Sequence, residues 1–168
     1  MMMQTPRELA PDDPWKRHPR MNIGMRKVRK LRIHWPIGAV SLRQLVEGDL
    51  EVLKADPGLA SLFDTLESCP ELGDFGNYRH VFESSLGFEG FTASTAANPT
   101  FGLAGERTFS PTFVLTTYLD ADLSEEAVSR LLERMIEVHP WEVPVIELSD
   151  PVRVSTAASI RPALGRAS

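Results

Sequence analysis

The order of apolar patterns along this 168-residue chain constrains its fold more than any other feature. A run of β-branched and aromatic residues at 112–119 predicts a strand, because such side chains pack well on a pleated surface. A helix should follow, capped at its start by Ser124 and ended by Pro140, since the residue before proline avoids helical angles. Its apolar stripe has helical spacing: Val128, Leu131, Leu132 and Met135. Residues 143–148 then predict the last strand.

The first half predicts one strand and a crossover made of two helical pieces. Residues 28–35 form a strand-like segment that ends before a proline and a glycine. Ser41 has the capping-box spacing to Gln44, which predicts a helix start. Asp56 followed by Pro57 predicts a second start, because aspartate caps free amides and proline fits the first helical position. The two predicted apolar stripes are Leu42, Leu45, Val46, Leu50 and Leu53, then Leu59, Leu62, Phe63 and Leu66.

The middle segment, residues 73–111, predicts a hairpin and a long loop. Residues 78–84 are strand-like, and Gly87 and Gly90 are suited to turns that need positive φ. The complete order is strand, split helix, strand with hairpin, strand, helix, strand. This order predicts an α+β fold of the ferredoxin-like, split βαβ type, in one domain over residues 25–154.

Both ends of the chain are predicted to be flexible tails. Residues 1–24 contain four prolines and few apolar residues, so they cannot bury enough surface to order themselves. Residues 1–32 carry nine basic and three acidic side chains, whereas the whole chain has a net charge of −5. The alternative to a solvated basic tail is an arm that orders on an acidic partner, with Trp15 as its anchor. The composition of residues 155–168 predicts a second flexible tail.

Several classes of protein are disfavoured. No stretch has the roughly 18 apolar residues that a membrane helix needs. Cys69 is the single cysteine, so an intrachain disulfide and a multi-thiolate zinc site are excluded, and a reducing, cytoplasmic location is expected. The body is acidic, so nucleic acid is not expected to bind it. No nucleophile elbow, P-loop or dinucleotide fingerprint is present, and we therefore predict no catalytic residues.

A set of motifs in the second half resembles a known family. The motifs are Gly76-Asn77-Tyr78, Gly87, Gly90-Phe91, Ala97-Asn98-Pro99, Gly102, Gly105-Glu106 and His139-Pro140-Trp141-Glu142-Val143-Pro144. Their order resembles the YqfO-type domain, which occurs as an insert in bacterial members of the Nif-three (NGG-interacting factor) family and as short free-standing proteins. The last motif is also similar to the His-Ser-Tyr-Glu-Val-Pro segment of the CutA divalent-cation-tolerance proteins. The resemblance covers about residues 73–150.

The resemblance implies a ferredoxin-like protomer of the PII/CutA group, which assembles as a trimer in CutA and PII. The chain departs from the pattern at Trp141, where the family has Tyr, and at Val143, where it has Glu. Its first crossover, residues 41–69, is also longer. Nothing resembles the metal-binding hydrolase core of the full Nif-three proteins, so that chemistry is not expected here. The candidate ligand-binding residues, all of which lie in these motifs, are Asn77, Tyr78, Asn98, Gly102, Gly105 and Trp141.

A divalent metal site is a second expectation. His139 and Glu142, with His80, would offer imidazole and carboxylate ligands suited to zinc or copper. The favoured alternative is structural: Pro140 stops the helix, Trp141 fills the core and His139 caps the last helical carbonyls. The glycine-containing loop after residue 97 would likewise either offer backbone amides to an anion or serve only as an ordered loop.

Two functions follow from these observations. The first is a non-catalytic regulatory module that binds a small ligand or metal between the subunits of a homo-oligomer, most simply a trimer. The second is a small accessory subunit of a larger enzyme complex, which docks through the N-terminal arm and the first crossover.

Overall fold

The computed structural model describes residues 22–159, which form one antiparallel sheet and four helices. The strands are β1 (Asn22–Pro36), β2 (Phe82–Thr92), β3 (Arg107–Asp120), β4 (Ile146–Leu148) and β5 (Val152–Ser159). The helices are α1 (Ala39–Val46), α2 (Val52–Ala55), α3 (Pro57–Glu67) and α4 (Glu125–Val138). None of the described helices is both long and apolar enough to cross a membrane.

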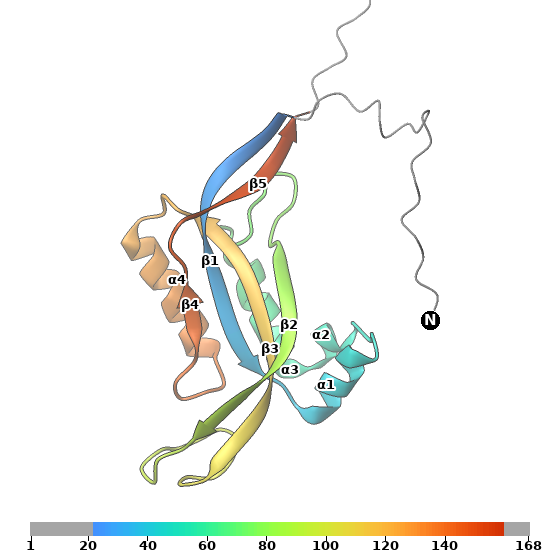
Figure 1. Ribbon diagram of the computed structural model, residues 1–168, viewed down its shortest axis with the longest axis vertical. Coiled ribbons are helices and arrows are strands. Elements are labelled where there is room, and N and C mark those ends of the chain that lie inside the picture. The colour runs from blue at the N-terminus through green and yellow to red at the C-terminus, as the bar shows by residue number, and fades with distance from the viewer. Residues whose placement is uncertain (1–21, 160–168) are drawn as a thin grey trace, which may run out of the picture.

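The strands lie in the order β2-β3-β1-β4, and every neighbouring pair is antiparallel. One crossover, α1 to α3, joins β1 to β2, and the other, α4, joins β3 to β4. This arrangement confirms the predicted ferredoxin-like α+β fold. β5 pairs with the first part of β1 and extends the sheet into a ribbon at one end, while β2 and β3 extend as a hairpin at the other (Figure 1).

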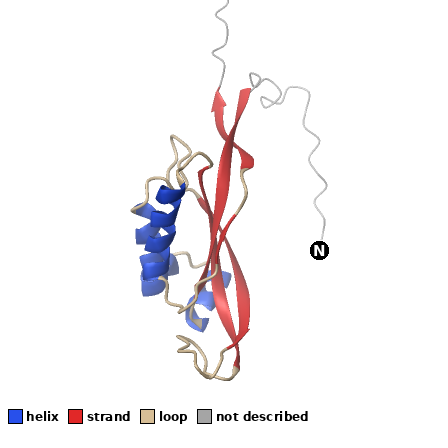
Figure 2. Cartoon of the chain, turned by 90° about the vertical axis from the view of Figure 1, so that its left-hand side faces the viewer, coloured by secondary structure: helices blue, strands red, loops and turns tan. Residues whose placement is uncertain are grey.

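The core lies between the sheet and the helices. Alternate residues of β1 and β3 point to the helical side, as a strand with one buried face requires, and Figure 2 shows α4 on that side. The stripes predicted for α3 and α4 meet this face. The core residues from these elements are Leu31, Ile33, Trp35, Phe113, Leu115, Leu119, Leu59, Leu62, Leu66, Val128, Leu131 and Met135, all of them buried.

Two of the three predicted helix starts are confirmed. The Asp56 carboxylate accepts hydrogen bonds from the backbone N–H groups of Gly58 and Leu59 at 2.9 and 3.0 Å. The Ser124 hydroxyl accepts from Ala127 N–H at 3.2 Å. The prediction for Ser41 was wrong: α1 begins at Ala39, and the Ser41 hydroxyl donates to the Asp56 carboxylate at 2.6 Å instead. A tertiary acceptor thus took the place of the local cap.

The predicted hairpin turn was also misplaced. Gly87 and Gly90 lie inside β2, opposite Thr112 and Phe109, and the chain turns only after Thr92. Glycine at position 90 is explained by packing and not by a turn, because a Cβ there would lie 3.0 Å from the Phe109 ring. β2 and β3 are therefore longer than predicted, and β4 is shorter, beginning at Ile146 rather than at 143.

The described strands extend into both predicted tails. β1 starts at Asn22, inside the predicted arm 1–24, and β5 reaches Ser159, inside the predicted tail 155–168. Neither segment has a clear apolar pattern, but each supplies the backbone partner that the other lacks: Asn22 pairs with Ser159 and Val28 with Val152. Residues 1–21, including Trp15, and residues 160–168 lie outside the described part of the chain.

Candidate functional site

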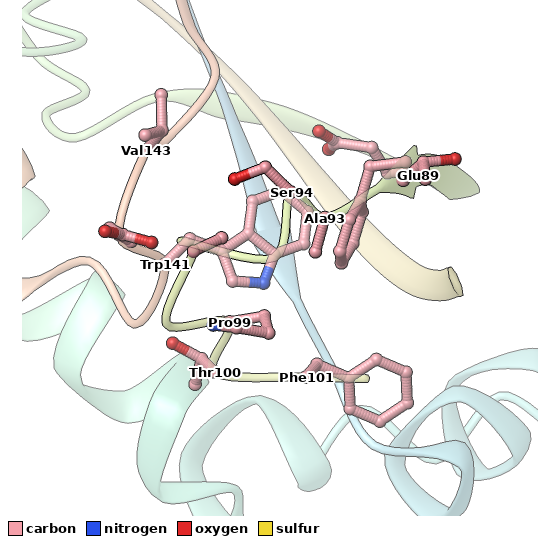
Figure 3. A pocket seen from close by; sticks show the side chains of 12 residues that line it. Glu89, Ala93, Ser94, Pro99, Thr100, Phe101, Trp141 and Val143 are labelled. Atoms are coloured by element: carbon pink, nitrogen blue, oxygen red, sulfur yellow. The ribbon is translucent and has the colours of Figure 1, made fainter. Parts of the chain in front are cut away.

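A cavity of about 310 Å³ lies between the tip of the β2–β3 hairpin and the segment that follows α4. The hairpin contributes the end of β2 and the loop after it, while the other wall is residues 141–143. Figure 3 shows the Trp141 indole between Ser94 and Pro99, with Phe101 further along the same loop. Segments from two distant parts of the sequence therefore form one site.

His139 holds the segment after α4 against the sheet. It is buried, with 8% of its surface exposed, and its Nε2 lies 2.7 Å from the carbonyl oxygen of His34 on β1. Its Nδ1 accepts a hydrogen bond from the backbone N–H of Trp141 at 3.1 Å, so Nε2 carries the proton and donates to His34. Burial lowers the pKa of His139, because the charged ring is poorly solvated there, although the bond to His34 opposes this shift. The ring is thus held neutral and in one tautomer.

A series of aromatic contacts connects the core to the cavity. The Trp35 and His139 rings lie 4.7 Å apart in an edge-to-face arrangement. The His139 and Trp141 rings are 5.7 Å apart, and the Trp141 and Phe91 rings 6.3 Å apart. Such pairs favour defined relative orientations. The position of Trp141 in the cavity wall is therefore fixed from the core outward.

The loop after β2 is tied to the same segment. The backbone N–H of Asn98 donates to the Glu142 carboxylate at 3.2 Å, and the Thr100 hydroxyl donates to the carbonyl of Pro140. Gly102 has φ of +85°, and a Cβ there would lie 2.1 Å from the hydroxyl oxygen of Thr108, so only glycine allows the loop to close in this way. The loop is an ordered wall of the cavity.

Two buried polar atoms at the cavity have no hydrogen-bond partner within the described part of the chain. They are the indole Nε1 of Trp141, a donor, and Oε2 of Glu89, an acceptor. Burial raises the pKa of Glu89, and attraction to a protonated His34 opposes this shift. His34 Nδ1 lies 3.9 Å from Glu89 Oε2, while its Nε2 lies 3.7 Å from Glu147. An unpaired buried donor and acceptor each cost stability, and such atoms mark candidate binding sites.

The predicted ligand residues are divided between two ends of the sheet. Trp141 lines the cavity, Asn98 is hydrogen-bonded to the lining residue Glu142, and Gly102 and Gly105 shape the adjoining loop. Asn77 and Tyr78 lie on the loop before β2, which is near β5 in Figure 1 and far from the hairpin tip. Tyr78 is 74% exposed. These two residues therefore do not belong to the cavity.

The three predicted metal ligands are not brought together either. Both ring nitrogens of His139 take part in hydrogen bonds to the backbone, and one oxygen of Glu142 accepts from Asn98. His80 lies on the same distant loop as Asn77, with φ of +53°. Among residues 22–159, no group of three or more His, Cys, Asp or Glu side chains is placed to hold a metal ion. His139 instead positions Trp141.

Most of the cavity residues had not been singled out as site residues in the sequence, among them Glu89, Phe91 and Phe101. Glu89 stands between Phe88 and Gly90, the other charged residue of the strand, Glu83, is exposed, and no local pattern marks Glu89 as functional. The residues that make Glu89 part of a site lie about 50 positions away along the chain. The two phenylalanines that flank Glu89 and Gly90, Phe88 and Phe91, offered only a weak signal.

Neither a protein-family model nor a curated protein matches the chain. Among solved structures, a Bacillus cereus protein related to NIF3 is similar over 79% of this chain, at 15% identity and a TM-score of 0.47, and the chain covers 29% of that protein. The periplasmic divalent cation tolerance protein CutA from Archaeoglobus fulgidus is 10% identical over 73% of this chain and 82% of its own, with a TM-score of 0.35. CutA from Synechococcus elongatus is 12% identical over 79% of this chain and 87% of its own, with a TM-score of 0.39. The sequence motifs resemble the same two groups.

Proposed function

We propose that this chain is a small-ligand-binding module of regulatory type, without catalytic activity of its own, that works as a homo-oligomer. The observation that supports the proposal best is the cavity beside Trp141, with one unpartnered donor and one unpartnered acceptor in its walls. A site of this kind, mostly apolar with a few fixed polar groups, is the usual form of a small-molecule pocket. A ligand that supplies one acceptor and one donor would satisfy both buried atoms.

Filling the cavity should abolish binding, and the chain offers a matched pair of variants for the test. Ala97 is half-buried and lines the cavity, whereas its neighbour Ala96 is exposed and does not. In Ala97→Phe the ring would occupy the ligand's space, and in Ala96→Phe it would extend into solvent. Native mass spectrometry of the full chain purified from its host should show a retained small molecule in the wild type and in A96F, and at least tenfold less of it in A97F. Equal retention in A97F would contradict the proposal.

The β2–β3 hairpin carries the surface expected of a subunit interface. Phe88 and Phe109 lie on the face that continues the core side of the sheet beyond the helices, and they are 73% and 65% exposed. Leu86 adjoins them and is also exposed. Exposed apolar patches of this kind mark interaction sites. We infer that a second copy of the chain covers this face, in line with the trimeric assembly that the sequence resemblance implies.

Replacing both rings should separate the subunits. Phe88→Ser with Phe109→Ser removes the two most exposed apolar side chains of the hairpin, so we expect a monomer in sedimentation velocity where the wild type is oligomeric. Val46→Ser, which changes a 71% exposed residue on α1, serves as the control and should leave the assembly intact. A wild-type chain that sediments as a monomer at micromolar concentration would sink this part of the proposal.

A second candidate function, accessory subunit of a larger complex, is favoured by the outward face of α1. Val40 and Val46 on α1 and Leu50 in the turn after it are exposed, and all three belong to the enlarged first crossover. In this case a larger protein should copurify with the wild-type chain, and V46S combined with Val40→Ser should lose it while the hairpin variant retains it.

A further inference from the structure

We propose that the ligand of this cavity is a small organic cation with an N–H donor, such as a protonated amine or a guanidinium, held between Glu89 and the aromatic walls. The inference rests on the proposed function and names the class of ligand. It follows from the charge, the hydrogen-bonding groups and the aromatic rings of the cavity.

The charge of the cavity is negative. Glu89 and Glu142 both line it, and none of the described lining residues is a lysine, arginine or histidine. The basic side chain beside Glu89 is His34, whose Nδ1 is 3.9 Å from Oε2, and His34 also lies 3.7 Å from Glu147 on its other side. Two carboxylates at one cavity repel an anion and attract a cation. An anionic ligand, which the glycine-containing loop had suggested, is therefore disfavoured.

The hydrogen-bonding groups of the cavity favour a ligand that carries an N–H donor. Glu89 Oε2 is buried without a partner, whereas Glu142 Oε2 already accepts from the Asn98 N–H. A charged N–H group forms a stronger and shorter bond to a carboxylate than a neutral donor does. Such a bond would also offset the burial that raises the pKa of Glu89. An acceptor elsewhere in the ligand would take the Trp141 indole N–H.

The rings of the cavity suit the same ligand. Phe91, Phe101 and Trp141 all contribute to its walls, and the face of an aromatic ring attracts an organic cation. The volume of about 310 Å³ is at the lower end of the range for ligand pockets. A bare metal ion fits less well, because no group of three ligating side chains is present among residues 22–159. A compact cation with an apolar body fits best.

The test compares benzylammonium with benzyl alcohol, which has the same ring and nearly the same size but no charge. Isothermal titration of the full chain at pH 7.5 should give a dissociation constant for benzylammonium at least tenfold lower than that for benzyl alcohol. Glu89→Gln keeps the shape of the side chain and removes its charge, and it should weaken benzylammonium binding at least tenfold. Glu83→Gln, on the same strand but outside this cavity, makes the same change in net charge and should leave the constant within twofold.

The outcomes separate this inference from the proposed function. Benzyl alcohol binding as tightly as benzylammonium, or E89Q binding benzylammonium as well as the wild type, would overturn the cation proposal. If A97F then abolished binding of the neutral compound, the cavity would still be a ligand site. Failure of both compounds to bind would also overturn the cation proposal. In that case, a host ligand retained by the wild type and lost from A97F would still support the proposed function. Thermal unfolding of E89Q and E83Q confirms that each variant is folded.

Discussion

Gly73→Ala is expected to destabilise the fold by about 3 kcal/mol, because the position combines a strained backbone with a lack of space. Gly73 is buried and has φ of +62°, and a Cβ there would lie 2.3 Å from the backbone nitrogen of Val81 and 2.5 Å from its carbonyl oxygen. Backbone atoms cannot move aside as a flexible side chain does. Gly73 also donates to Tyr118 O at 2.7 Å and accepts from Val81 N–H at 3.1 Å, so a shift would pull β2 away from β3.

Gly76→Ala provides the control for this prediction. Gly76 has φ of +76°, but a Cβ there would meet no atom within 4 Å. Only the unfavourable backbone conformation remains, which costs about 1 kcal/mol. Urea unfolding followed by circular dichroism should therefore place G73A well below G76A in free energy of unfolding. Equal losses in the two variants would mean that the close approach to Val81 is not what requires glycine.

His139→Ala is expected to cost about 3 kcal/mol and to abolish ligand binding. The substitution removes a buried ring, leaves a cavity against Trp35, and strips two hydrogen bonds from the backbone of His34 and Trp141. Because those bonds set the position of Trp141, the wall of the ligand cavity should loosen too. His80→Asn, a change at a histidine on the distant loop to a residue that tolerates its φ of +53°, should spare binding. Retained binding in H139A would contradict this role.

The same histidine predicts how stability changes with pH. Its pKa is lowered in the folded state, so the unfolded chain binds the proton more readily. The contribution of neutral His139 is present above the ordinary pKa of histidine and is lost as the pH falls below it. Glu89, whose pKa is raised, acts in the opposite sense during its own titration. The titration of Glu89 is common to the wild type and His139→Asn, so it cancels in the difference between their unfolding free energies. This difference should be larger at pH 7.5 than at pH 5.5.

Much of the fold was predictable because its signals are local. Asp56-Pro57 and Ser124 cap helices within three residues of themselves, and Pro140 ends α4 as expected. The prediction of a cap at Ser41 was wrong because its hydroxyl donates to Asp56, 15 residues away. The prediction of a turn at Gly90 was wrong because glycine at this position leaves space for the Phe109 ring on the neighbouring strand. Contacts of this kind depend on which strands become neighbours, and no window of sequence contains that information.

The site was predictable only in part, for the same reason. The motif around His139 drew attention to Trp141 and Glu142, and both line the cavity. It did not show that both nitrogens of His139 bond to the backbone, which makes the residue a support for Trp141 instead of a metal ligand. Glu89 became visible only when the folded chain placed it beside His34, 55 residues earlier in the sequence.

The indole N–H resonances of ¹⁵N-labelled protein test the central claim most directly. The chain has three tryptophans, each assigned by its own Trp→Phe variant. The indole N–H groups of Trp141 and Trp35 both lack a partner among the described residues, but Trp141 lines the cavity while Trp35 lies in the core. On addition of benzylammonium, the Trp141 resonance should move in a saturable way and that of Trp35 should stay in place, and A97F should suppress the shift. A Trp141 resonance unchanged at saturating concentration, or one that moves equally in A97F, would contradict the claim that this cavity binds the ligand.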